Sequence, residues 1–191
     1  MEVPSTRITR ADLDAENYYK PSASLNVNGH IQMDAGLGTV RFRGDVKATH
    51  SIFAASGTGI TAHRITAGQY INAGLGIRAA FGIRAGSGIT AGSDIDAGWG
   101  ITAGSEIDAG WGIRAGDGIK AGFGIRAGLQ IYAQKTISSK MRIFAGVCAW
   151  KIPSPEEMTI TAAHIDGVVA YGTVKLLAAE GPVLAPGEDA D

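Results

Sequence analysis

The chain has little cysteine, few aromatic residues and almost no net charge. Cys148 is the one cysteine among 191 residues, so no intrachain disulfide can form, and we expect a reducing, cytoplasmic setting. The formal net charge of −1 supplies no overall field that would draw the protein onto nucleic acid or anionic lipid. No run approaches the roughly 18 uncharged apolar residues of a membrane span, and we find no signal peptide in the first twenty residues. The sequence therefore predicts a soluble protein with no membrane partner.

Glycine, in contrast, is abundant and follows a regular period. Isoleucine recurs at every sixth position from Ile65 to Ile143, Ala lies two residues after each Ile except at Ser139, and Gly usually follows that Ala. The unit Ile-x-Ala-Gly-x-Gly does not fit an α-helix, whereas alternation within Ile-x-Ala suits a short strand whose Ile and Ala share one face. The Gly-x-Gly that follows can adopt positive φ and turn a corner after each strand.

This repeat predicts an all-β fold, a single-stranded triangular β-helix. If three units close one turn, each coil contains about 18 residues and neighbouring coils stack about 4.8 Å apart. The pattern extends upstream in degraded form through Val40, Val46 and Ile52, with a loop or register correction near residues 55–64. We therefore expect a β-helix of roughly seven coils over residues 25–150.

Both ends of the chain depart from the repeat. Residues 1–24 contain Thr9 three residues before Asp12, a capping spacing, and we expect a short helix or a flap that caps the first coil. Residues 151–180 contain two apolar runs separated by Asp166-Gly167, which predicts a β-hairpin cap. We expect residues 181–191 to form a disordered acidic tail. Caps at both ends would shield the unpaired strand edges of a solenoid.

The period and two particular segments resemble known families. The six-residue period resembles that of the hexapeptide-repeat, left-handed β-helix proteins, many of which are acyltransferases. That resemblance implies a catalytic His at a coil corner, but the four histidines lie outside the regular array: His30, His50, His63 and His164. Residues 38–48 and 141–148 resemble the repeats of bactofilins, the polymer-forming cytoskeletal β-helices of bacteria. That resemblance implies a right-handed, triangular, non-catalytic fold that self-associates.

Candidate partner-binding residues occupy the outward registers. The position two before each Ile holds residues as different as Trp and Asp, so we expect a solvent-facing corner rather than a packed interior site. Its aromatic members are hot-spot types for binding a partner, and the alternative is that they pad the Gly corners. They are Phe81, Trp99, Trp111 and Phe123. At 18 residues per coil, Phe81 stacks on Trp99.

Two short acidic pairs lie twelve residues apart in the same region: Asp94 and Asp96, then Glu106 and Asp108. Paired carboxylates can bind Ca²⁺. The coil period favours a different role, because it aligns Asp96 with Arg78 and Arg114, and Asp108 with Arg126. We therefore predict a cross-strand charge ladder with no metal, and we include the four acids in the candidate partner-binding surface.

These patterns indicate a non-catalytic binding protein with no cofactor. We expect surface contact with another protein or with a protein–nucleic acid complex, as an inhibitor of the anti-CRISPR type or an adaptor encoded by a phage or mobile element. The first alternative is a bactofilin-like, self-assembling cytoskeletal or scaffold subunit. The second is an acyltransferase of the hexapeptide type.

Overall fold

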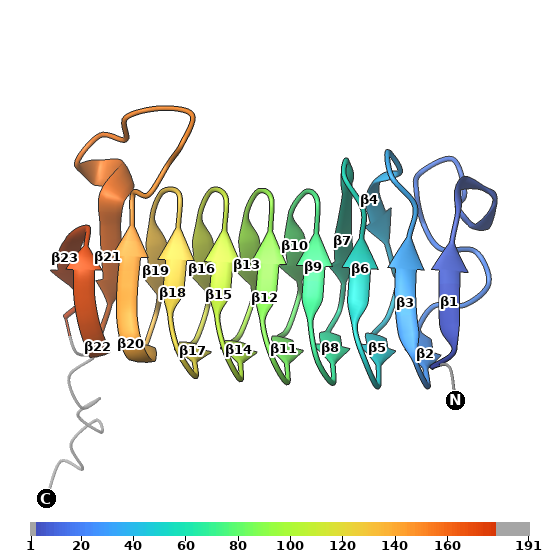
Figure 1. Cartoon of the computed structure of the whole chain (residues 1–191), viewed down its shortest axis with the longest axis horizontal. Coiled ribbons are helices and arrows are strands. Elements are labelled where there is room, and N and C mark those ends of the chain that lie inside the picture. Colours follow the sequence, from blue (N-terminus) through green and yellow to red (C-terminus); the bar gives the residue numbers. More distant parts are fainter. Residues whose placement is uncertain (1–2, 179–191) are drawn as a thin grey trace, which may run out of the picture.

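The Ile-x-Ala triplets form three-residue β-strands, and the chain winds through them as a parallel β-solenoid (Figure 1). This computed structural model describes residues 3–178. Each strand pairs in parallel with the strand one coil away, as Ile77 pairs with Ile95 and Ala79 with Ala97, so a regular coil contains 18 residues. The strands form three faces, which we number in the order in which the chain passes through them.

Each face is a stack of parallel strands. Face 1 consists of β2 (Leu25–Val27), β5 (Val46–Ala48), β8 (Ile65–Ala67), β11 (Ile83–Ala85), β14 (Ile101–Ala103), β17 (Ile119–Ala121) and the first half of β20 (Thr136–Ala145). Face 2 consists of β1 (Ser5–Ile8), β3 (His30–Met33), β6 (Ile52–Ala54), β9 (Ile71–Ala73), β12 (Ile89–Ala91), β15 (Ile107–Ala109), β18 (Ile125–Ala127) and the second half of β20. Face 3 consists of β4 (Gly38–Arg41), β7 (Thr58–Ala62), β10 (Ile77–Ala79), β13 (Ile95–Ala97), β16 (Ile113–Ala115), β19 (Ile131–Ala133), β21 (Thr159–Ala162) and β23 (Thr173–Leu176). The strand β22 (His164–Tyr171) pairs along β20 over faces 1 and 2.

The predicted single-stranded β-helix is confirmed. Face 3 contains eight strands, so the solenoid is longer than the roughly seven coils expected from residues 25–150. It is longer because strand pairing begins with β1, before Leu25, and continues to β23, beyond Trp150.

The core is a stack of isoleucines flanked by alanines. Every Ile from Ile65 to Ile143 is at most 1% exposed, and the Ala of the same triplet is at most 6% exposed. Complete burial of one such Ile contributes about 1.5–3 kcal/mol. Because each Ile lies between the Ile one coil before and the Ile one coil after, a defect in one coil is felt mainly by its two neighbours.

The glycines of the repeat have a different role from the one expected. Among residues 3–178, the glycines with positive φ all lie outside the regular part of the array, as Gly57 and Gly167 do, so the regular corners do not use the positive φ that glycine allows. The first Gly after each Ala is required by coil stacking instead. A Cβ built on Gly104 would lie 2.0 Å from the carbonyl oxygen of Gly86, the equivalent residue of the previous coil. The second Gly is less constrained, because a Cβ on Gly100 would lie 3.3 Å from the nearest atom.

The irregular spacing near residues 55–64 reflects the register correction that the sequence predicts. The corner after β6 contains Gly57 at φ 72°, and β7 has five residues where the strands of the regular coils have three, which places two additional residues before Ile60. The buried Thr58 hydroxyl donates to the Asp34 carbonyl at 2.7 Å and accepts from the Leu37 N–H at 3.0 Å. The next corner is shortened to His63 and Arg64, after which β8 resumes the regular period.

The N-terminal segment covers the first coil, as predicted, but it also contributes a strand. Ser5 pairs in parallel with His30, so β1 extends face 2. The capping box predicted at Thr9 and Asp12 is present and opens the short 3-10 helix η1 (Arg10–Asp12). Hydrogen bonds from the Thr9 backbone N–H and hydroxyl hold the pKa of Asp12 below its ordinary value. The chain then returns along the edge of β4, where the Tyr19 N–H donates to the Arg41 carbonyl at 2.9 Å.

The predicted C-terminal β-hairpin is wrong. β21, β22 and β23 pair in parallel with β19, β20 and β21, so the solenoid continues through residues 159–176. Asp166 and Gly167 lie inside β22, and Gly167 at φ 150° turns a corner rather than reversing the chain. A hairpin would have left the last Ile stack uncovered, whereas the parallel path places Ile165 beside Ile137. The acidic tail predicted for residues 181–191 lies outside the described residues.

Candidate functional site

The predicted aromatic residues lie at the coil corners, but on three different edges of the solenoid. Phe81 and Trp99 occupy the corner between faces 3 and 1, Trp111 the corner between faces 2 and 3, and Phe123 the corner between faces 1 and 2. The exposed fractions are 58% for Trp99, 46% for Trp111 and 51% for Phe123. These side chains are therefore available to a partner, but no single flat contact covers all four.

The Phe81–Trp99 column is confirmed. Their ring centroids lie 4.9 Å apart in an edge-to-face arrangement, and the backbone N–H of Trp99 donates to the Phe81 carbonyl at 2.8 Å. The column continues to His63, whose ring lies 6.1 Å from that of Phe81. His63 thus occupies a coil corner, the position that the acyltransferase resemblance gives to a catalytic His, although here it packs against an aromatic ring.

The acidic residues form the predicted charge ladder. Asp96 pairs across face 3 with Arg78 at 3.0 Å and is in register with Arg114. Asp108 pairs across face 2 with Arg126, and this hydrogen-bonded carboxylate raises the pKa of Arg126.

The other two acids lie at corners on different edges of the rod. Asp94 accepts a hydrogen bond from the Gly112 N–H at 2.9 Å and so ties two coils together. Glu106 is exposed at the corner between faces 1 and 2. Within residues 3–178, no group of three or more His, Cys, Asp or Glu side chains is placed to hold a metal ion.

Trp99 and Trp111 border one shared face, as the twelve-residue spacing predicts. They lie on opposite edges of face 3, whose outward row contains Asp96 and Arg114. Asp94 lies beside the same face, whereas Glu106, Asp108 and Phe123 do not. Four of the eight predicted residues therefore lie on or beside face 3, and a fifth, Phe81, stacks on Trp99. The four are Trp99, Trp111, Asp94 and Asp96.

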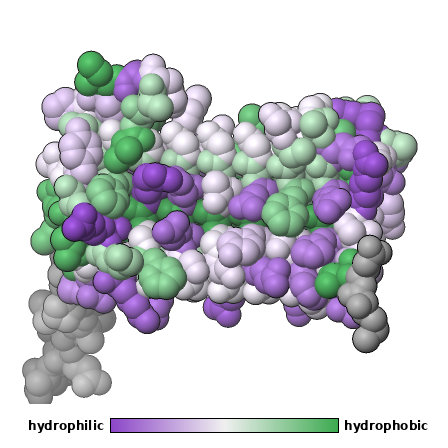
Figure 2. All heavy atoms as spheres, viewed as in Figure 1, coloured by the Kyte–Doolittle hydropathy of each residue, from purple (hydrophilic) through white to green (hydrophobic). Residues whose placement is uncertain are grey.

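Sequence reasoning missed a projecting loop formed by residues 146–158, which we name the tryptophan loop (Figure 1). Its Trp150 ring packs on Trp111, with centroids 5.6 Å apart, and is 55% exposed. Ile152 is 96% exposed. In the same view, Figure 2 shows strongly hydrophobic residues on this projection. The only signal in the sequence was a Trp placed just after the repeat ends and before two prolines.

The tryptophan loop is held in place by polar contacts at its base. Lys151 forms an ion pair with Glu157, and the Ser154 N–H donates to the same carboxylate at 2.9 Å. These contacts hold the pKa of Glu157 below its ordinary value. The short 3-10 helix η2 (Glu156–Met158) then leads into β21. The loop is therefore an ordered platform that carries exposed apolar side chains.

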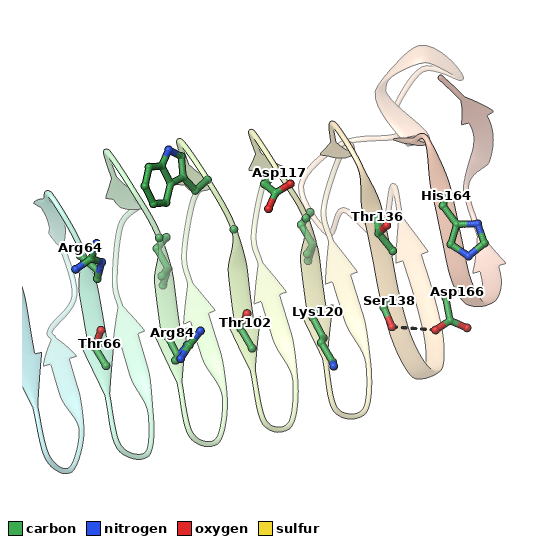
Figure 3. Close-up of a pocket in the computed structure, with 16 residues that line it drawn as sticks. Arg64, Thr66, Arg84, Thr102, Asp117, Lys120, Thr136, Ser138, His164 and Asp166 are labelled. Atoms are coloured by element: carbon green, nitrogen blue, oxygen red, sulfur yellow. Dashed lines mark hydrogen bonds between the residues drawn. The ribbon is translucent and has the colours of Figure 1, made fainter. Parts of the chain in front are cut away.

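A second surface lies along face 1, where a shallow groove follows the solenoid axis (Figure 3). Its floor is one row of outward side chains, one from each coil: Thr66, Arg84, Thr102, Lys120 and Ser138. Lys47, which is in register with Thr66, extends the row beyond the groove. Trp99, Arg64 and His164 lie beside the row. None of the residues in this row was predicted from the sequence as a binding residue, because the 18-residue period was applied to the acidic and aromatic residues and not to this row.

Comparisons with known proteins give no further assignment. No protein-family model matches the chain, and neither the curated proteins nor the solved structures contain a match. The fold therefore rests on the strand pairing described above. Among the described residues, no helix is long and apolar enough to cross a membrane.

Proposed function

We propose that this protein is a binding protein that acts by surface contact with a macromolecular partner, and that Trp111 and Trp150 form the centre of that contact. The observation that carries the proposal is the pair itself. Two indole rings stack at 5.6 Å on an ordered projection, and both stay about half exposed. Trp is among the residue types that dominate binding hot spots, and a rigid, prearranged pair loses little conformational entropy on binding.

The rest of the surface supports a partner that meets one edge of the rod. Face 3 leads from this corner to Trp99 across the row that contains Asp96 and Arg114. Charged side chains around an apolar centre are the usual arrangement of a protein interface. We favour an inhibitor of the anti-CRISPR type or an adaptor encoded by a phage or mobile element. A solenoid suits such a role because its outward residues can change while the Ile and Ala positions keep the fold.

The double change Trp111→Ser and Trp150→Ser tests this proposal. Ser already occupies the same corner column at Ser93, so we expect the melting temperature to change little. The partner, identified by capture with the unmodified chain, should bind about thirtyfold more weakly, a loss of about 2 kcal/mol. Isothermal titration calorimetry measures that loss.

The matched control is Phe123→Ser, which removes an equally exposed ring from a different corner and should leave the affinity within about twofold. A partner whose affinity survives the double Trp change while the protein stays folded would contradict the proposal. Loss of binding in the Phe123 control would place the contact on another edge.

Self-assembly is the second candidate function, and the C-terminal coil favours it. Within the described residues, no further strand pairs with the outer edge of β22 or β23. This coil exposes Val168 and Leu176, each at 63%, together with Tyr171 and Val174. An uncovered strand edge with apolar side chains is a template for pairing with another chain. This arrangement would suit a bactofilin-like scaffold subunit.

If the protein self-assembles through this coil, the mean size of its oligomers should increase with protein concentration. Val174→Lys with Leu176→Lys places charges on the exposed edge strand and should convert any oligomers or filaments to monomers. Light scattering and negative-stain microscopy report the change. Oligomers that persist in this variant, or an unmodified chain that stays monomeric at high concentration, would remove this candidate.

A further inference from the structure

We infer that face 1 is a binding surface for single-stranded nucleic acid. This inference goes beyond the proposed function, because face 1 is a different surface from the tryptophan loop. Along face 1, cations alternate with hydroxyls on successive coils: Lys47, Thr66, Arg84, Thr102, Lys120 and Ser138. Figure 3 shows the row from Thr66 to Ser138. Since coils stack about 4.8 Å apart, the three cations form a straight row with about 10 Å between neighbours.

The cations of this row have no protein partner in the described part of the chain. Lys47, Arg84 and Lys120 are exposed, and residues 3–178 offer them neither an ion pair nor a hydrogen bond. The equivalent outward rows on the other two faces mix the signs, with Asp96 between Arg78 and Arg114 and Asp108 next to Arg126. Face 1 is therefore the face on which no acid separates the cations from Lys47 to Lys120.

The acids nearest to face 1 interact with residues outside the three cations of the row. Glu106, exposed at the corner between faces 1 and 2, interacts with Arg126 on face 2. Asp45 is paired with Arg64 at 3.4 Å, and Asp117 with Lys135 at 2.8 Å. Asp166 lies at the far end, on β22, where it accepts a hydrogen bond from Ser138. An anion with regularly repeating charges would satisfy the cations through ion pairs and the intervening hydroxyls through hydrogen bonds.

The net charge of the whole chain does not reveal the local positive charge of face 1. All 17 basic residues lie within residues 3–178, whereas five of the 18 acidic residues lie outside that range. The charge that matters for a polyanion is the local charge of the face that it meets. The near-neutral total is therefore compatible with one basic face.

Aromatic side chains at both edges point to exposed bases as well as phosphates. Trp99 borders the groove on one edge, and Tyr70 lies on the other edge, with exposed fractions of 58% and 47%. A positively charged track flanked by aromatic rings is the usual arrangement of a single-strand binding surface, because phosphates follow the charges while bases stack on the rings.

A duplex suits this face less well. Its bases are stacked inside and offer no free face to Trp99, and reading its major groove needs an inserted helix or two-stranded ribbon. The helices of the described residues are η1 and η2, each of three residues. A straight row of cations also follows an extended strand better than it follows a backbone that winds around an axis.

Fluorescence anisotropy on the full-length chain tests the inference, with labelled oligodeoxythymidylate and oligouridylate of about 20 nucleotides as probes. We expect binding that weakens as salt rises, with a slope of log K against log salt near −2 for three cations on a single strand. A preference between the two oligomers identifies DNA or RNA as the ligand. Failure of both to bind at low salt would overturn the inference without touching the tryptophan-loop proposal.

Two double variants, which lower the net charge of the protein by the same amount on different faces, locate the site. Arg84→Glu with Lys120→Glu should weaken binding at least about tenfold, whereas Arg114→Glu with Lys175→Glu, on face 3, should weaken it less than about threefold. Equal losses in both variants would show that only total charge matters and would overturn the inference. Competition by the matching duplex or by polyglutamate as effectively as by the single strand would also overturn it.

Base stacking has its own readout. The changes Trp111→Phe and Trp150→Phe leave Trp99 as the one tryptophan of the chain. Oligomer binding should then quench its fluorescence, and Trp99→Ala in the natural chain should weaken binding about tenfold. Tight binding without quenching, and with no loss in Trp99→Ala, would show that the strand does not stack at this edge.

Discussion

Replacing Ile107 by Asp is expected to leave the protein unfolded or insoluble. Ile107 is 1% exposed and lies between Ile89 and Ile125 in the stack of face 2. A carboxylate at this position finds no partner, and its burial costs several kcal/mol in addition to the lost apolar contact. Net stabilities are about 5–15 kcal/mol, so one such change is enough to remove most of the folded population.

The adjacent residue and a conservative change provide the controls. Asp108, the next residue of the same strand, is a natural Asp whose side chain faces outward. The expected damage from Asp at position 107 therefore comes from its inward position and not from the residue type. Ile107→Val keeps the stack and should cost only about 0.5–1.5 kcal/mol. Thermal melts followed by circular dichroism compare the three proteins. An unchanged melting temperature in Ile107→Asp would contradict the packing of this core.

The second large effect concerns two glycines that look alike in the sequence. Gly104→Ala is expected to destabilise the protein by about 3 kcal/mol, because its Cβ would lie 2.0 Å from the Gly86 carbonyl oxygen and would force two coils apart. Gly100→Ala, with 3.3 Å of space, should change stability by less than about 1 kcal/mol. Urea denaturation gives both values.

The natural sequence supports this contrast. The register of Gly100 elsewhere holds Asp94, Glu106 and Gln130, all with side chains, within the regular array. In the same array, the position equivalent to Gly104 holds another residue three times: Ala80, and, toward the C-terminal end, Gln134 and Lys140. Equal stabilities of the two Ala variants would refute the stacking role that we assign to the first Gly.

The sequence predicted the solenoid well because inward and outward positions are separated by a strict period. Ile and Ala fill the interior at every unit, so 18 residues per coil and the columns of Phe81 with Trp99 and of Asp108 with Arg126 follow from counting. The capping box at Thr9 was also predictable, because it depends on neighbouring residues alone.

Features that depend on coil-to-coil contacts or on the chain ends were not predictable in the same way. Gly104 is required by a carbonyl eighteen residues away, which local turn rules do not consider. Asp166-Gly167 satisfies the local signal of a hairpin, yet burial of Ile137 and Ile143 favours a further parallel strand. The tryptophan loop lies where the period stops. The basic row of face 1 appears only when every third unit is compared.

The central claim is that three units close one coil, since every surface described above depends on the columns that this period creates. Spin labels at Asn72 and Thr90, with Cys148 changed to Ser, measure it directly by continuous-wave electron paramagnetic resonance. The structure pairs these outward positions on adjacent strands of face 2, so strong dipolar broadening is expected at a separation of about 5 Å between strands. Labels at Thr90 and Thr102, on faces 2 and 1, should show far weaker broadening. Sharp lines from the first pair, or equal broadening in both pairs, would contradict the three-unit coil.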